Sequence, residues 1–139
     1  MEKSATNDVK TSNYQVKNIE SVMAGSDVHA RLFTLAPGEV IPWHYHPETA
    51  DHYFVLQGDL TISTRRPEET RTVGVGRNHR LAPGTPHLSA NRSAADCQFL
   101  LLQAVGVVDW VKADEWPQGK KASTCTCAGE DRWLGRSLT

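Results

Sequence analysis

Hydrophobic and polar residues alternate in short runs through the middle of the chain, between Val28 and about Val105. Alternation with a period of two puts every second side chain on one face, so each run predicts a half-buried β-strand. A further run from Tyr14 to Ile19 predicts a first strand, and we expect the ordered domain to begin near it. The other predicted strands are 28–35, 40–46, 52–56, 60–64, 71–75, 87–91 and 98–105.

Turn-forming residues separate these runs, including Pro37-Gly38, Gly58-Asp59 and Pro83-Gly84. No stretch before Val108 carries a helical apolar stripe of three turns, and no glycine-rich phosphate loop joins a strand to a helix. These observations exclude the Rossmann and P-loop folds. Strands this short must bury their faces and protect their edges, so the pattern predicts an all-β sandwich or closed barrel.

The two ends of the chain lack this pattern. Residues 1–13 show no apolar periodicity and are expected to form a flexible N-terminal arm, while the β-domain is expected to cover 14–112. The polar, turn-rich residues 113–139 predict an irregular C-terminal tail, in which Trp133 and Leu134 could belong to a short helix.

The composition narrows the classes of partner. A length of 139 residues suits one domain, and 39% hydrophobic with 22% charged residues is ordinary for a globular protein. A formal net charge of -1 provides no general field for nucleic acid or acidic lipid. No apolar run approaches the roughly 20 residues that span a bilayer. We therefore expect a cytoplasmic protein that binds neither nucleic acid nor membrane.

The three cysteines do not form a disulfide framework. Cys97 precedes an apolar run and is interpreted as a small buried hydrophobic residue. Cys125 and Cys127 lie in the polar tail without a second pair of metal ligands at zinc-site spacing. We interpret these two as incidental, and their role stays open.

The histidines predict a metal site. His44 and His46 are two residues apart, so on a strand both side chains leave the same face and can hold one ion. A short loop follows, and Asp51 then starts the next run, where a hairpin would bring it beside the histidine pair. His87 comes directly after Gly84-Thr85-Pro86, a tight loop that can orient a ligand at the start of a strand.

The carboxylate ligand has two candidates. Asp51 has the same strand parity as Tyr53, which favours an inward side chain, although the aspartate side chain is short. Glu48, just after Pro47, is the alternative. His52 has the opposite parity, and His79 precedes the second turn, so we interpret both as surface residues.

Two motifs resemble those of the cupin superfamily. Gly38, His44, His46, Asp51 and Gly58 have the spacing of the first cupin motif, with aspartate where the family usually has glutamate. The second motif is similar in the following residues, with Ala82 where proline is usual: Gly76, Ala82, Gly84, His87 and Asn91. With the strands around them, the two motifs cover about residues 28 to 108.

This resemblance implies an all-β cupin double-stranded β-helix, a jelly-roll barrel of the RmlC-like type. It also implies that His44, His46, His87 and Asp51 hold one divalent ion, either iron, manganese, nickel or zinc. Imidazole and carboxylate donors suit such ions, and a four-ligand set leaves positions open on an octahedral ion. Cupins commonly pair through edge strands, which implies a homodimer.

The fold and the metal leave several functions possible. The first hypothesis is a dioxygenase-like enzyme that acts on a small oxygenated substrate bound at the metal. An alternative is a metal-dependent isomerase or lyase in which Tyr53 moves a proton; a tyrosine two residues after the metal acid is similar to cupin lyases acting on dimethylsulfoniopropionate. The other interpretation of Tyr53 is an aromatic residue that packs inside the barrel. The remaining alternative is a non-catalytic module that binds a small molecule.

Overall fold

The computed structural model describes residues 9–11 and 13–113, and every regular element in that part of the chain is a β-strand. The strands are β1 (Val9–Lys10), β2 (Gln15–Val16), β3 (Asn18–Ala24), β4 (Val28–Leu35), β5 (Val40–Tyr45), β6 (Ala50–Gln57), β7 (Leu60–Thr64), β8 (Glu69–Val73), β9 (Asn78–Leu81), β10 (His87–Ala90), β11 (Cys97–Ala104) and β12 (Val111–Lys112). No helix among these residues is long and apolar enough to cross a membrane.

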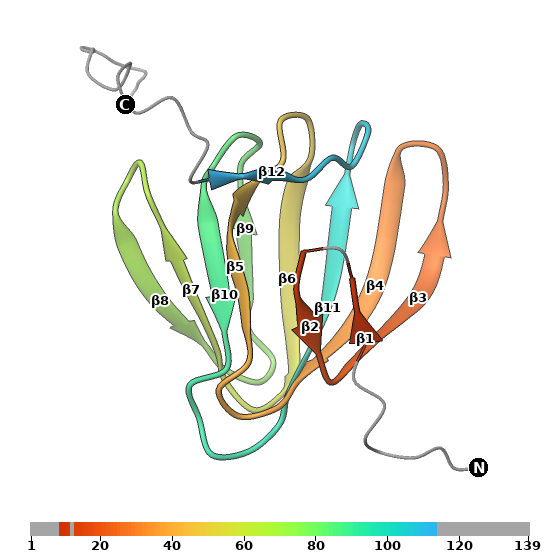
Figure 1. Ribbon diagram of the computed structural model, residues 1–139. Helices are drawn as coiled ribbons and strands as arrows, with labels where there is room; N and C mark the ends of the chain where they lie inside the picture. Colours follow the sequence, from red (N-terminus) through yellow and green to blue (C-terminus); the bar gives the residue numbers. More distant parts are fainter. Residues whose placement is uncertain (1–8, 12, 114–139) are drawn as a thin grey trace.

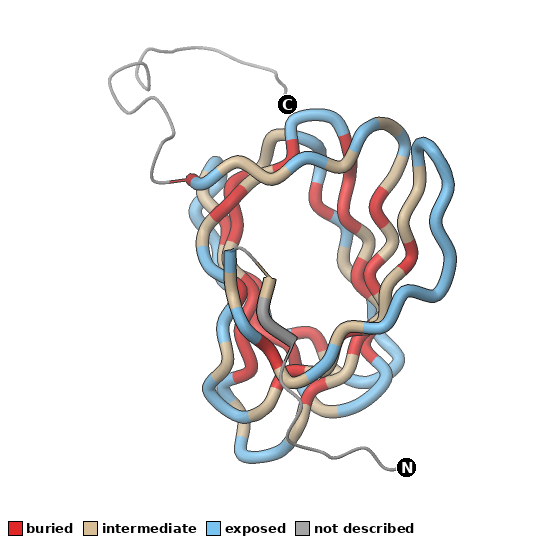
Figure 2. Tube along the Cα trace, turned by 45° about the vertical axis from the view of Figure 1, so that its right-hand side comes forward, coloured by how far each residue is buried: buried red, intermediate tan, exposed pale blue. Residues whose placement is uncertain are grey.

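The strands form two five-stranded antiparallel sheets that face each other as a barrel (Figure 1). One sheet has the order β12-β5-β10-β7-β8 and the other the order β3-β4-β11-β6-β9. Strands β1 and β2 make a separate two-stranded hairpin beside them. In Figure 2 the strands form a ring, and the buried residues lie along the strands, while the connecting loops are mostly exposed. The predicted jelly-roll architecture is therefore confirmed.

The core lies between the two sheets and follows the alternation of the sequence. Along β11, buried and partly exposed residues alternate without interruption over all eight residues. Phe99 of β11 pairs with Phe33 of β4, and their rings stack 5.2 Å apart with planes 2° apart. Leu60 and Ile62 of β7 complete the core from the opposite sheet. Cys97 is fully buried, as the sequence predicted.

The predicted strand boundaries match the structure for some strands and differ for others. Strands β4 and β7 have the predicted bounds. The predicted run from Tyr14 to Ile19 is divided between β2 and β3, and β9 was not predicted. Strand β9 has only four residues with a single buried apolar side chain, Leu81, which is too short for a periodic signal.

The ends of the chain differ in part from expectation. Val9–Lys10 pairs with Gln15–Val16, so two residues of the predicted arm form part of a hairpin. The predicted tail lies outside the described residues from position 114 onward. The possible helix at Trp133 and the pair Cys125 and Cys127 belong to that part of the sequence.

Gly58 shows why the first motif ends on glycine. Its φ is +73°, a left-handed conformation that favours glycine. A Cβ atom on this residue would lie 2.5 Å from the carbonyl oxygen of Asp96. This close approach lets the chain turn from β6 into β7 directly against the start of β11.

Candidate metal centre

His44, His46, Asp51 and His87 meet inside the barrel. His44 lies on β5, His46 follows that strand directly, and His87 begins β10, where it pairs with His44. Asp51 comes from β6 in the facing sheet. All four side chains are buried, and one potential ligand atom from each lies within 4.8 Å of the others. Two sheets thus supply one cluster of donor atoms.

Backbone carbonyl groups fix the orientation of each histidine ring. The Nδ1 atom of His44 lies 2.7 Å from the carbonyl oxygen of Pro42, and that of His87 lies 2.8 Å from the oxygen of Thr85. The Nδ1 atom of His46 lies 2.6 Å from the oxygen of Asp109. A carbonyl oxygen can only accept, so each Nδ1 carries the proton and each Nε2 keeps its lone pair. This is the tautomer of a metal-binding histidine.

Asp51 lies among these Nε2 atoms. Its Oδ2 atom is 3.1 Å from Nε2 of His87 and 3.6 Å from Nε2 of His46. The Tyr53 hydroxyl group donates to the same oxygen at 3.3 Å, and the Gln103 amide donates to Oδ1 at 3.1 Å. The carboxylate is therefore held by two hydrogen-bond donors while it faces the histidines.

The protonation states suit metal binding. Burial, together with the nearby His87, lowers the pKa of His44 to about 2. Burial also lowers the pKa of His46. For Asp51, burial acts to raise the pKa, but contacts with His87 and His46 and the hydrogen bond from Gln103 outweigh it, so its pKa lies below the ordinary value. At neutral pH these groups are neutral imidazoles and a carboxylate, the forms that bind cations.

One buried atom tests whether the cluster fits an ion. Nε2 of His87 is buried and makes no hydrogen bond. Because Nδ1 carries the proton, Nε2 and the Asp51 oxygen 3.1 Å away are both acceptors. Donor atoms on opposite sides of one ion would lie about 4.2 Å apart, close to the observed span of the cluster. The unpaired nitrogen and the donor types fit a divalent ion, so the cluster could hold one.

The structure distinguishes the two candidate carboxylates. Asp51 is 2% exposed, whereas Glu48 is exposed and accepts a hydrogen bond from the backbone nitrogen of Val107 at 3.1 Å. Glu48 thus supports the loop after β11. His52 and His79 lie outside the cluster, and Nε2 of His52 accepts a hydrogen bond from Arg80.

Two residues close to the motifs do not face the cavity. Strand parity with Asp51 and Tyr53 would place Gln57 on the inner face, and Asn91 is the last residue of the second motif. A register shift opposite Phe99 leaves Leu56 as an extra residue on β6, and Gln57 is exposed. The Asn91 amide donates to the carbonyl groups of Leu35 and Ala95, so it joins loops away from the cavity.

The cavity beside the cluster contains residues that the sequence analysis missed. It encloses about 30 Å³ and is lined by His44, His46, Asp51 and Tyr53 together with Arg31, Gln103, Tyr14 and Trp110. Arg31 and Gln103 had a signal in the sequence, since each is a polar residue in the buried phase of an apolar strand. Tyr14 and Trp110 had none, because the barrel brings them to its mouth from outside the two motifs.

Residues 105–113, here called the closing segment, cover the mouth of the barrel (Figure 1). The segment ends in β12, which pairs with β5 at Tyr45 and His44. The Trp110 indole stacks on the His44 ring at 3.7 Å and contacts the Tyr14 ring at 5.3 Å. The same segment supplies the carbonyl oxygen that orients His46.

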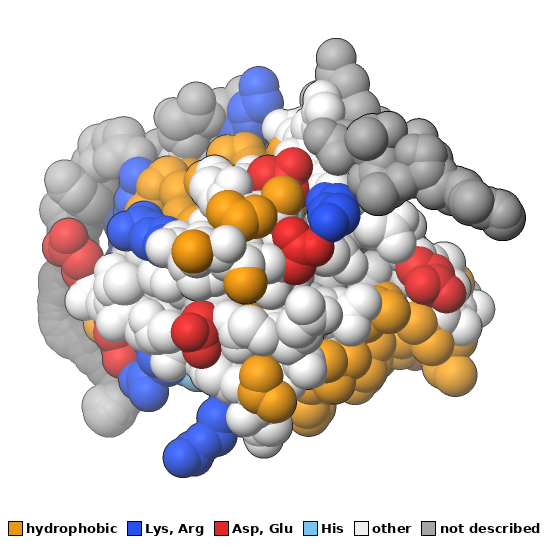
Figure 3. Space-filling model, turned by 90° about the horizontal axis from the view of Figure 1, so that it is seen from below, with side chains coloured by type: hydrophobic (Ala, Val, Ile, Leu, Met, Phe, Trp, Pro, Cys, Tyr) orange, Lys and Arg blue, Asp and Glu red, His pale blue; other side chains and the backbone are white. Residues whose placement is uncertain are grey.

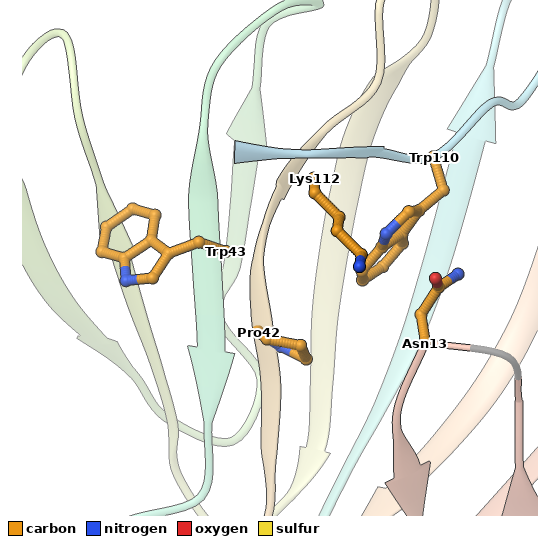
Figure 4. A pocket seen from close by; sticks show the side chains of 5 residues that line it. All are labelled: Asn13, Pro42, Trp43, Trp110 and Lys112. Atoms are coloured by element: carbon orange, nitrogen blue, oxygen red, sulfur yellow. The ribbon is translucent and has the colours of Figure 1, made fainter. Parts of the chain in front are cut away.

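A second, wider pocket lies on the outer side of Trp110 (Figure 4). It has a volume of about 300 Å³ and is lined by Asn13, Pro42, Trp43, Trp110 and Lys112. Trp110 and Lys112 extend into it from the closing segment, opposite Pro42 on β5 (Figure 4). Because Trp110 also lines the inner cavity, its ring separates the two spaces.

Two facing antiparallel sheets with three histidines and an aspartate gathered between them define a β-barrel protein with a candidate metal centre. The chain belongs to the cupin family, since the family model for the Cupin domain matches residues 31–103. No curated protein sequence matches the chain significantly.

Solved structures show the same fold. TT1209 from Thermus thermophilus is 24% identical, with a TM-score of 0.59 over 63% of this chain and 82% of its own. A Klebsiella pneumoniae protein with a double-stranded β-helix domain is 18% identical, with a TM-score of 0.61 over 79% and 87%. An oxalate oxidase is 20% identical, with a TM-score of 0.57 over 62% of this chain and 46% of its own. At these identities the likeness establishes the fold alone.

Proposed function

We propose that the chain is a metal-dependent, dioxygenase-like enzyme that acts on a small oxygenated substrate. The observation that carries the proposal is the convergence of three Nε2 lone pairs and the Asp51 carboxylate. The Nδ1–H group of each histidine donates a hydrogen bond to a backbone carbonyl, which leaves the Nε2 atoms available. A divalent ion held by this set would act as a Lewis acid and, if redox-active, could also exchange electrons with substrate. Iron and manganese suit this chemistry, and nickel or zinc are the other candidates.

The surrounding residues would hold the substrate and exclude water. Trp110 and Tyr14 cover the cavity, and Ile41, Phe33 and Leu101 give it apolar walls. A volume of about 30 Å³ leaves room for roughly two or three water-sized groups. A substrate of a few heavy atoms therefore suits the closed cavity, and a larger one requires Trp110 to move toward the outer pocket.

The proposal is tested by metal content and oxygen consumption measured together. Protein purified without added metal should contain about one redox-active ion per chain by elemental analysis, and it should consume oxygen with a diketone, flavonol, thiol or small carboxylate such as oxalate. His44→Ala should lose most of the metal, while the matched control His52→Ala should keep it. Zinc or nickel without oxygen uptake would sink the oxygenase proposal.

Tyr53 supports a second candidate, a metal-dependent isomerase or lyase. Its hydroxyl group lies 3.3 Å from Oδ2 of Asp51 and 3.2 Å from Oγ of Ser89, and its side chain lines the cavity. Burial, aided by the charge of Asp51, raises the pKa of Tyr53 well above its ordinary value, so the hydroxyl group keeps its proton. Tyr53→Phe should then abolish proton exchange at the substrate while metal content stays unchanged.

The remaining alternative is a module that binds a small molecule without turnover. Ligand-dependent stabilisation in a thermal screen, with no product formed from any stabilising ligand, would favour it over both enzyme classes.

We also propose that the chain forms a homodimer. The β3-β4-β11-β6-β9 sheet carries exposed apolar side chains, since Met23 of β3 is 62% and Leu56 of β6 is 52% exposed. Hydrophobic side chains also gather on one side of the molecule in Figure 3. Packing this face against a second copy would remove these side chains from water. Light scattering coupled to size-exclusion chromatography should give twice the mass of the chain, and Met23→Lys combined with Leu56→Lys should give a monomer.

A further inference from the structure

Arg31 places a positive charge inside the metal-site cavity. It lies on β4 in phase with Phe33 and Leu35, whose side chains form the core, and it lines the same cavity as His44, His46 and Asp51. Its guanidinium carbon lies 5.3 Å from the centre of the Phe33 ring. A charged group at an inward position of a strand is costly unless something in the interior compensates for it.

The protein compensates for only part of that charge. Nη2 of Arg31 donates a hydrogen bond to Oε1 of Gln103, and this fixes the Gln103 amide so that its nitrogen faces Asp51 and His46. Nε of Arg31 is buried and makes no hydrogen bond. Among the described residues, no carboxylate forms an ion pair with Arg31.

The charges of the cavity therefore favour an anion. The cluster contains one carboxylate, Asp51, and with a divalent ion in place the cavity would carry that ion and the Arg31 guanidinium against this single negative charge. A carboxylate would accept two parallel hydrogen bonds from the arginine guanidinium group. Lysine cannot form this bidentate arrangement. The small cavity volume favours small anions over large ones.

We propose that Arg31 binds the carboxylate group of the ligand, so that the metal-site cavity takes a small carboxylic acid in its ionised form. This inference rests on the proposed function, because it places the ligand beside the metal cluster. It makes Arg31 a specificity-determining residue that selects an anion over a neutral molecule of the same shape. Gln103 links Arg31 to Asp51, so the anion-binding group and the metal cluster share one hydrogen-bonded network.

The test compares acetate with its neutral isostere acetamide on Zn²⁺-loaded protein by isothermal titration calorimetry. Wild type should bind acetate more tightly than acetamide by about tenfold or more, since a hydrogen bond to a charged group contributes the equivalent of that factor. Arg31→Met should lose most of this preference, with only the part due to the zinc ion remaining, and it should keep its zinc content. The matched control Arg77→Met, on the outer surface, should leave both unchanged.

A second measurement uses wild type alone, in case Arg31→Met does not fold. In an NMR titration of Zn²⁺-loaded protein, the Nε–H signal of Arg31 should shift on addition of acetate and stay in place with acetamide. If zinc binds but Arg31→Met keeps the preference for acetate, or wild type shows neither preference nor shift, the assignment of Arg31 is wrong. If wild type fails to bind zinc, the metal site itself is wrong, and the two failures are distinguished by the zinc content of the same samples.

Discussion

The indole ring of Trp110 lies flat against the imidazole ring of His44, with centroids 3.7 Å apart and planes 9° apart. His44 is a proposed ligand, whereas Trp110 belongs to the closing segment and separates the inner cavity from the outer pocket. Access to the cluster from the outer pocket therefore requires a stacked ring to move.

Trp110→Ala should accelerate the release of metal. An aromatic contact of this kind contributes about 0.5–1.5 kcal/mol, so release should be faster by roughly 2- to 10-fold. The rate can be followed by mixing Zn²⁺-loaded protein with an excess of a chromophoric chelator. Trp43→Ala is the matched control, since Trp43 stacks on Arg65 outside the barrel at 4.0 Å. Equal rates in the three proteins would contradict a gating role for Trp110.

Asp51→Asn should weaken metal binding by more than about 100-fold, because it removes the charge of a proposed ligand. Loss of a residue that only hydrogen-bonds to a ligand typically costs roughly 10- to 100-fold in affinity. Asp51→Glu should keep the metal, because glutamate is the usual residue at this place in the motif that the chain resembles. Glu48→Gln is the control, since this exposed side chain bonds to Val107. Competition with a chelator of known affinity measures all three, and weaker binding in Glu48→Gln alone would reverse the assignment.

The metal-free protein should lose stability as the pH falls below about 6.5, the ordinary value for histidine. Burial lowers the pKa of His44 to about 2 and also lowers that of His46, so between these limits the unfolded chain binds protons that the folded chain does not. Stability then falls with decreasing pH by about 1.4 kcal/mol per unit for each such histidine. The lowered pKa of Asp51 acts in the same direction at more acidic pH.

Urea unfolding of chelator-treated protein at several pH values between about 7.5 and 5 measures this effect. His44→Gln should show a smaller slope than wild type, and His52→Gln should not. A free energy of unfolding that stays constant over this range would mean that the histidines are not held neutral by burial.

Gly58→Ala should destabilise the fold by about 2 kcal/mol or more, because a left-handed φ and a backbone clash act together. Gly38→Ala is a matched control with a φ of +86° and no atom within 4 Å of the added Cβ, so it isolates the cost of the conformation alone. Chemical denaturation should give Gly58→Ala a clearly lower free energy of unfolding than Gly38→Ala. Equal losses would show that the strand turn relaxes around Asp96.

The sequence predicted the four-residue cluster because each member lies on or beside a regular strand, where parity determines the face. Parity failed at Gln57, since a bulge at Leu56 shifts the register and bulges leave no periodic signal. Arg31 and Gln103 were predictable in principle, as polar residues in the buried phase of β4 and β11. Trp110 was not, because the closing segment has no alternation and its path is set by packing against the finished barrel.

The match to the Cupin domain ends at residue 103, before the closing segment begins. Tyr14, the Asp109 carbonyl group and Trp110 all lie outside that match. The Asp109 carbonyl group orients His46, and Trp110 stacks on His44 and contacts Tyr14. Two proteins that share the matched barrel can therefore differ in which molecules reach its interior. Transfer of an activity between relatives of this chain should depend on whether these flanking segments are also shared, because the barrel determines where chemistry can occur and its flanks determine which molecules take part.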